Sequence, residues 1–245
     1  ESGCGTANWN YVTSQKRIEA SGNAQINAST IEALGSDDLV IWADEIVISA
    51  NLDWSTKTLT FRSKGSIRMP GGVKINTDGG DVILQADSDD SGVGEIRLGT
   101  LSTDNGSIET SGGSISLVGG SDPSVGFAQS TSSSETGKPA AGVALYGFDL
   151  DAGGGDITIR GAGSTSVSTR AVLFEPSNTS SGSSVFTSGT GAVAIFGDGS
   201  NIQAGSNAWG VTISSLNVTT ELGDITIQGS GNRVVSNSRG MVASN

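Results

Sequence analysis

The densest group of side chains that could do chemistry in this chain is acidic. Asp87, Asp89 and Asp90 lie together in the segment ADSDDSG. Carboxylate oxygens are the hard ligands that Ca²⁺ prefers. Their spacing does not follow an EF-hand loop, and the chain has no array of calcium-binding nonapeptide repeats. The segment therefore predicts a low-affinity Ca²⁺ site or, as the loose spacing favours, a solvated acidic turn that needs no cofactor.

Two further carboxylates, Asp156 and Asp224, each follow a glycine at equivalent positions of an internal repeat. Acids on adjacent coils of a parallel β-helix would lie ~5 Å apart, a separation that glycoside hydrolysis can use. We expect three coils between these two, and therefore ~14–15 Å, which is too far. The position favours turn residues that hydrogen-bond to their own backbone.

The remaining residue types also argue against catalysis. The chain has no histidine, so imidazole acid–base chemistry is excluded. The basic residues of the second half, Arg160, Arg170, Arg233 and Arg239, are scattered along the sequence. We predict no catalytic residues and a non-enzymatic protein.

One aromatic residue is a candidate for binding. Trp209 stands where the other copy of the repeat has Ala141, at the start of a predicted strand. An exposed indole can stack on a sugar ring or anchor a protein partner. Covering a turn or a loop is the alternative for Trp209.

Charge and composition narrow the class of protein. The net charge is −12 over 245 residues, with no basic run, so we predict no nucleic-acid partner. No apolar run approaches the ~20 residues of a membrane span, so we predict no membrane insertion. One cysteine, Cys4, rules out an internal disulfide. No signal peptide is visible, which predicts a trimmed product or a piece of a longer protein.

The elements that must position these residues are predicted by a repeat. Residues 141–163 recur as residues 209–231 with an offset of 68, and nine of 23 positions are identical. Apolar pairs at i and i+2, such as Ile157 and Ile159, recur along the chain between turn signals rich in glycine, asparagine and aspartate. This pattern predicts an all-β fold, a parallel β-helix built from short strands.

The valines that begin strands suggest the size of a coil. Val143, Val172, Val193 and Val211 follow glycine or alanine and together span the 68-residue repeat. We therefore expect three coils per repeat, each of about 23 residues.

Three segments are expected to differ from the regular coils. The polar segments 121–140 and 175–190 should project from the solenoid as loops. Residues 1–38 are predicted to form an irregular amino-terminal coil or cap, and residues 39–245 a single elongated β-helix that continues from it.

The repeat resembles a known class of sequence. The phrases Gly155–Gly163 and Gly223–Gly231, each preceded by a Gly-Val strand, look like filamentous haemagglutinin-like repeats of large bacterial surface adhesins, many of them passengers of two-partner secretion. The amino half has similar phrasing, as in Gly80–Asp87. The resemblance implies a right-handed β-helix that is secreted or held at the bacterial cell surface. The chain lacks the Asn-Pro motif of the secretion domain, so it resembles a passenger segment.

The function that follows is mechanical. We expect a stiff rod that presents loops for multivalent attachment to a glycan or protein of a cell surface or extracellular matrix. A self-associating subunit of an extracellular fibre or sheath, a homopolymer, is the first alternative. A polysaccharide lyase or hydrolase on the same fold is the second.

Overall fold

The structure is a computed structural model, and it is nearly all β. It describes residues 9–21, 25–101, 106–130, 139–165, 169–178, 182–201, 209–231 and 239–243. No helix in these ranges has the length and apolar character needed to cross a lipid bilayer.

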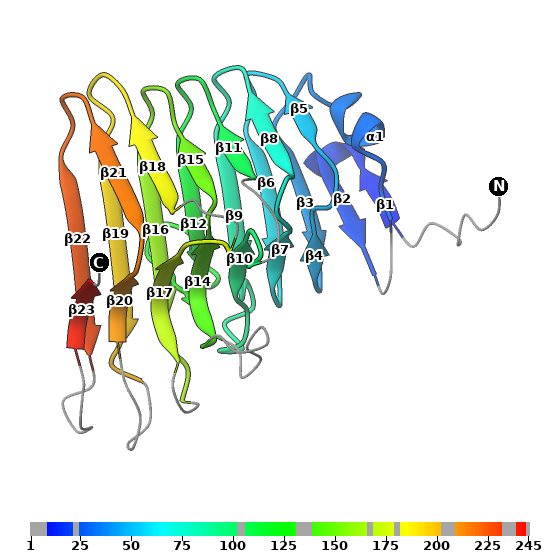
Figure 1. Ribbon diagram of the computed structural model, residues 1–245. Coiled ribbons are helices and arrows are strands. Elements are labelled where there is room, and N and C mark those ends of the chain that lie inside the picture. Colours follow the sequence, from blue (N-terminus) through cyan, green and yellow to red (C-terminus); the bar gives the residue numbers. More distant parts are fainter. Residues whose placement is uncertain are drawn as a thin grey trace.

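Three sheets make up the molecule, here called A, B and C (Figure 1). Sheet A contains, in spatial order, β1 (Trp9–Val12), β2 (Arg17–Ala20), β3 (Leu39–Ala43), β6 (Leu59–Ser63), β9 (Val82–Ala86), β12 (Ile115–Gly119), β16 (Ile157–Ala162), β19 (Val193–Gly199) and β22 (Ile225–Gly231), and the short β13 (Ala128–Gln129) also pairs with β16. Sheet B contains β4 (Ile46–Val47), β7 (Ile67–Met69), β10 (Ile96–Leu98), β14 (Ala141–Tyr146), β17 (Arg170–Glu175), β20 (Trp209–Ile213) and β23 (Arg239–Ala243). Sheet C contains β5 (Leu52–Trp54), β8 (Lys74–Thr77), β11 (Ser107–Glu109), β15 (Asp149–Asp151), β18 (Ser183–Thr187) and β21 (Leu216–Thr220).

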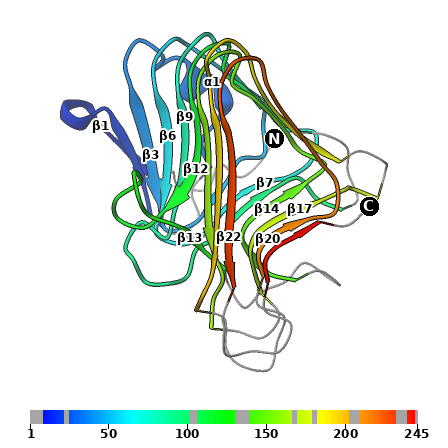
Figure 2. The same cartoon turned by 90° about the vertical axis from the view of Figure 1, so that its left-hand side faces the viewer.

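From β3 onward the chain visits sheets A, B and C in turn, and we call one such circuit a coil. Each strand pairs in parallel with the equivalent strand of the next coil. Figure 2 looks along the stack, and the strands of each sheet superpose as a wall around the core. The expected β-helix-like solenoid of parallel sheets is therefore present.

The expected coil size was wrong. Ile157 of β16 pairs with Val193 of β19, which pairs with Ile225 of β22, so the 68-residue repeat is two coils. Val143, Val172 and Val211 are register partners within sheet B, whereas Val193 lies in sheet A. The valines looked like equivalent coil starts because each begins an inward-facing pair, and a local pattern does not say to which sheet a pair belongs.

The core follows from side-chain alternation along each strand. In β16 the side chains of Ile157 and Ile159 are fully buried, while Thr158 between them faces outward and is half-buried. The register places Ile157 between Ile115 and Val193, so the inward side chains form continuous ladders through the stack. Each coil therefore needs its neighbours to complete its apolar contacts, which explains how a chain poor in apolar residues can fold.

The turn from sheet C to sheet A explains the recurring Gly-Asp phrase. A Cβ atom added at Gly155 would lie 2.3 Å from the carbonyl oxygen of Gly113 one coil earlier, so only glycine fits there. The next residue, Asp156, accepts a hydrogen bond at Oδ1 from the backbone N–H of Ala192 at 2.8 Å. Asp81 accepts one from Ser114 in the same way. These aspartates thus bond to the following coil, and the expected bond to their own backbone was wrong.

The two polar segments do not simply project as loops. In 175–190, residues Ser183–Thr187 form β18, with Ser183, Val185 and Thr187 facing inward and buried. Serine and threonine fill inward positions there, which made the strand look like a loop. In 121–140, β13 folds back to pair with β16. Residues 131–138 and 179–181 lie outside the described ranges.

The amino end is built differently from the coils. β1 pairs with β2 in the antiparallel sense, whereas β2 joins β3 in the parallel sense and places Ile18 beside Ile41 in the core. After the short 3-10 helix η1 (Thr13–Gln15) and β2, the helix α1 (Ala28–Glu32) packs against β5. The division into a cap at 1–38 and a β-helix at 39–245 stays a prediction.

Candidate functional site

The acidic segment predicted to bind Ca²⁺ begins directly after β9. Asp87 is 3% exposed, and its Oδ1 accepts hydrogen bonds from the Ser91 hydroxyl at 2.9 Å and from the Gly92 N–H at 3.0 Å. Burial raises the pKa of the Asp87 carboxyl, and these hydrogen bonds oppose part of that rise. The side chain of Asp87 therefore closes the turn from within.

The other two carboxylates point to different backbone groups. Asp89 accepts from the Ser91 N–H at 3.3 Å. Asp90 accepts from the Ser121 N–H at 2.9 Å, and the hydrogen bonds from Ser121 lower the pKa of the Asp90 carboxyl. Within the described part of the chain, no three acidic, histidine or cysteine side chains are grouped closely enough to hold a metal ion. All three carboxylates thus have partners in the turn, and the Ca²⁺ site stays a prediction.

Trp209, the predicted binding aromatic, begins β20 in sheet B and is half-buried. The guanidinium carbon of Arg170 lies 3.8 Å from the centroid of the Trp209 ring. Arg170 is itself buried, and burial lowers the pKa of its guanidinium. A desolvated cation over an indole is a favourable packing contact. This contact gives Trp209 a structural role, and its role in binding stays a prediction.

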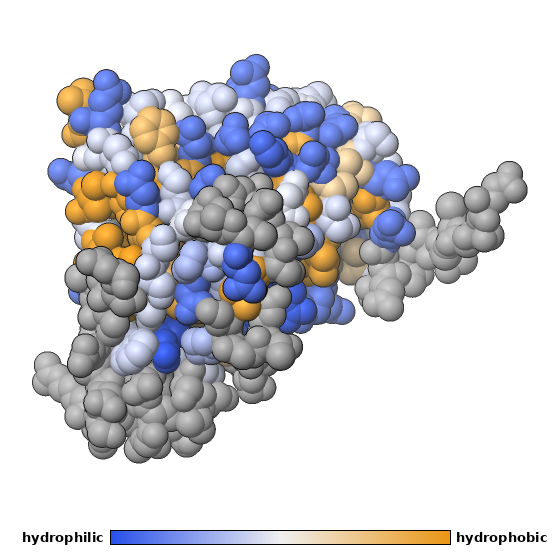
Figure 3. Space-filling model, in the orientation of Figure 1, coloured by the Kyte–Doolittle hydropathy of each residue, from blue (hydrophilic) through white to orange (hydrophobic). Residues whose placement is uncertain are grey.

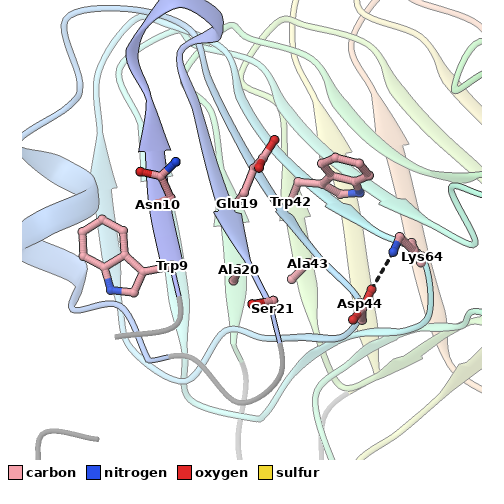
Figure 4. Close-up of a pocket in the computed structure, with 9 residues that line it drawn as sticks. All are labelled: Trp9, Asn10, Glu19, Ala20, Ser21, Trp42, Ala43, Asp44 and Lys64. Atoms are coloured by element: carbon pink, nitrogen blue, oxygen red, sulfur yellow. Dashed lines mark hydrogen bonds and ion pairs between the residues drawn. The ribbon is translucent and has the colours of Figure 1, made fainter. Parts of the chain in front are cut away.

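A groove near the amino end of sheet A combines aromatic, acidic and basic side chains. It has a volume of about 400 Å³ and is lined by residues from β1, β2, β3 and the turns that follow β3 and β6. Figure 4 shows these residues: Trp9, Asn10, Glu19, Ala20, Ser21, Trp42, Ala43, Asp44 and Lys64. We call it the Trp42 groove.

Two ion pairs organise the Trp42 groove. Lys64 Nζ lies 2.9 Å from Asp44 Oδ1, and the hydrogen bond to Asp44 raises the pKa of Lys64 (Figure 4). Arg17 pairs with Glu19, and its guanidinium carbon lies 4.7 Å from the centroid of the Trp42 ring. The two cations offset the two carboxylates, so the groove presents many polar atoms at low net charge.

The sequence contained a signal for Trp42 that sequence reasoning did not use. Leu39 and Ile41 are the inward pair of β3, so Val40 and Trp42 must face outward. Trp54 has the opposite parity in β5, is buried, and donates its indole N–H to the carbonyl oxygen of Lys57 at 2.8 Å. Alternation alone therefore distinguishes an indole at the surface from one that fills the core.

Sheet C carries a second feature that sequence reasoning missed. Its outer surface is hydrophilic where β8 and β11 cross it (Figure 3). Glu109 of β11 and Asp151 of β15 are register partners on adjacent coils. Burial raises the pKa of the nearby Asp149, and the charge of Glu109 raises it further. This is the neighbouring-coil arrangement of acids that a polysaccharide-cleaving site would need, although neither described cavity contains these residues.

Asp156 and Asp224 are not brought together. They occupy β-strand starts in sheet A that are two coils apart, where three had been expected. Comparison of the chain with known protein families, with curated proteins and with solved structures gives no match. Any function must therefore be argued from the geometry above.

Proposed function

We propose that this chain is a non-enzymatic segment of a large extracellular adhesin or surface filament. In this proposal the β-helix is right-handed, the protein is secreted or held at a bacterial cell surface, and the solenoid acts as a stiff rod. The rod carries outward side chains and turns that attach to a glycan or protein of another surface. The resemblance of its repeat to filamentous haemagglutinin-like sequences supports the location and the class.

The observation that supports this proposal best is the unbroken register of sheet A. Parallel pairing links strands from β2 to β22, although the coils differ in length from 20 residues between Leu39 and Leu59 to 42 between Ile115 and Ile157. Extra residues are placed in the connections, and the core ladder is preserved. Such a framework lets surface segments vary while the rod keeps its stiffness, at a rise of ~4.8 Å per coil.

Multivalency is the mechanism that suits such a rod. Many copies on one surface would each make a weak contact with a partner surface. Once one contact has formed, the others occur at high effective concentration, so overall avidity exceeds the single affinity by orders of magnitude. No step in this mechanism requires catalysis.

Attachment as a function of surface density tests the proposal. Beads coated with the purified chain at several densities would be applied to epithelial cell monolayers, with albumin-coated beads as the control. We expect attachment that rises more steeply than coating density. Absence of attachment above the albumin level at every density would contradict the adhesin function.

Two parallel measurements address the alternatives. Electron microscopy of the purified chain distinguishes isolated short rods from the long fibres that a self-associating structural subunit would form. Release of reducing ends from polysaccharides distinguishes an enzyme, and the acids Glu109, Asp149 and Asp151 would then be the residues to substitute. We expect short rods and no release of reducing ends.

A further inference from the structure

We propose that the Trp42 groove binds a neutral carbohydrate. This inference names a partner class for the adhesin proposed above, and its biological meaning rests on that proposal. The ligand would be an uncharged oligosaccharide, one or two of whose rings enter the groove. The argument uses the shape of the groove, its aromatic wall, its polar atoms and its charge.

The size of the groove matches a small ligand. Its volume of about 400 Å³ falls in the range of about 300–1,000 Å³ that is common for small-molecule sites. It is formed by three consecutive strands of one sheet, β1, β2 and β3, so its walls are held by backbone pairing on both sides of β2. A site held by sheet strands needs little ordering when a ligand enters, which lowers the entropic cost of binding.

The aromatic side chains supply an apolar surface of the right kind. A pyranose ring presents C–H groups on one face, and the negative face of an indole attracts them. Trp42 faces outward from β3, and Trp9 lies on the other side of the groove (Figure 4). The indole Nε1 of Trp42 is buried and has no hydrogen-bond partner among the described residues. A sugar hydroxyl entering between Trp42 and Lys64 would give this donor an acceptor.

The polar side chains match hydroxyl groups. Glu19 and Asp44 are acceptors, Lys64 is a donor, and the Asn10 amide is both. Sugar hydroxyls donate and accept at neighbouring carbons, so they can use all three kinds of group. The ion pairs of Asp44 with Lys64 and of Glu19 with Arg17 hold the charged groups in place before a ligand arrives.

Charge favours a neutral ligand over an acidic one. The cations near the groove, Lys64 and Arg17, are already paired with carboxylates. The whole chain carries a net charge of −12, which repels polyanions at a distance. An acidic polysaccharide would have to displace Asp44 or Glu19 from its cation, whereas a neutral sugar can hydrogen-bond to the pairs as they stand.

The other cavity has a different chemistry. It measures about 390 Å³, lies beside α1, and is lined largely by core side chains such as Ile31, Ile41 and Phe61. Apolar walls of this kind do not provide hydrogen bonds for hydroxyl groups. The Trp42 groove is therefore the cavity that suits a sugar.

Isothermal titration of the full chain tests this inference. The probes are maltohexaose, cellohexaose and laminarihexaose as neutral oligosaccharides, and heparin as an acidic one. We expect at least one neutral oligosaccharide to bind, with an affinity that changes little between 50 mM and 500 mM salt. Trp42→Ala should weaken that binding by about tenfold or more, the loss typical of a hot-spot aromatic residue. Trp42→Phe should retain most of the affinity.

Two controls keep the test decisive. Phe196→Ala removes another aromatic side chain from the outer face of sheet A, at β19, and should bind like the parent. Asp44→Ala removes an exposed carboxylate, so it should weaken binding even if Trp42→Ala fails to fold. Circular dichroism and thermal melting would check the fold of each variant.

The outcomes separate this inference from the adhesin function. Failure of all neutral oligosaccharides to bind, or unchanged binding by both folded groove variants, would overturn the groove. Salt-sensitive binding of heparin alone would overturn its neutral specificity. If coated beads attach to cells while no neutral oligosaccharide binds, the adhesin stands and the groove does not. If the oligosaccharide binds but the beads never attach, the groove stands and the adhesin does not.

Discussion

The ladder in sheet A allows one substitution to be made at two levels of burial. Ile157 and Ile225 are equivalent in the repeat and occupy the same inward column, which also contains Val193. Ile157 is 0% exposed, whereas Ile225, in the last described strand of sheet A, is 47% exposed. The substitutions Ile157→Ala and Ile225→Ala therefore remove the same atoms from different surroundings.

The magnitudes follow from burial. Truncating a fully buried isoleucine to alanine costs about 2–5 kcal/mol, because apolar contacts are lost and a cavity remains. Ile157 is enclosed by Ile115 and Val193 of the adjacent coils, so we expect a cost in the upper half of that range. Ile225 is about half exposed already and leaves no closed cavity, so we expect about 1–2 kcal/mol. Thr158→Ala, on the outward face of β16, is the matched control and should cost less than about 0.5 kcal/mol.

Urea unfolding followed by far-ultraviolet circular dichroism measures these costs. Tryptophan fluorescence adds positional information, because Trp42 and Trp54 lie near the amino end and Trp209 lies near the carboxyl end. A solenoid can unfold coil by coil, so separate transitions by the two probes would themselves report local stability. Equal costs for Ile157→Ala and Ile225→Ala, or a cost for Thr158→Ala that matches Ile157→Ala, would refute the inward ladder.

Three further predictions concern the turns and the carboxylates. Gly155→Ala should destabilise the protein by about 1–3 kcal/mol in the same urea assay, because its methyl group would meet the carbonyl of Gly113; an unchanged midpoint would contradict the close approach. Asp149 has a raised pKa when folded, so its contribution to stability falls as pH rises through that pKa, and its ionised form is unfavourable at pH 7. Asp149→Asn keeps an acceptor for the Ser184 N–H and should raise the free energy of unfolding at pH 7 by about 0.2–1 kcal/mol, a gain that should vanish below about pH 4; a loss at pH 7 would argue against it. The melting temperature should be the same in Ca²⁺ and in EDTA, whereas a rise with Ca²⁺ that Asp89→Asn abolishes would establish the predicted cation site.

Much of the fold was available from the sequence because it depends on local alternation. A strand places successive side chains on opposite faces, so pairs such as Ile157 and Ile159 could be assigned to the core without knowing their neighbours. The Gly-Asp phrase marked a turn for a similarly local reason, since glycine was needed at a close approach. The parity of Trp42 in β3 was equally available, and it would have placed that indole at the surface.

Other features were decided by which strands meet across the stack. The pairing of Ile157 with Val193 and Ile225 made the repeat two coils, and Ser183–Thr187 became a strand because β15 and β21 flank it. The Trp42 groove likewise exists because antiparallel β1 lies beside β2. Alternation is set by covalent geometry within a few residues. Pairing between coils is set by hydrogen bonds and packing across 20 to 42 residues of intervening chain, and no local pattern specifies it.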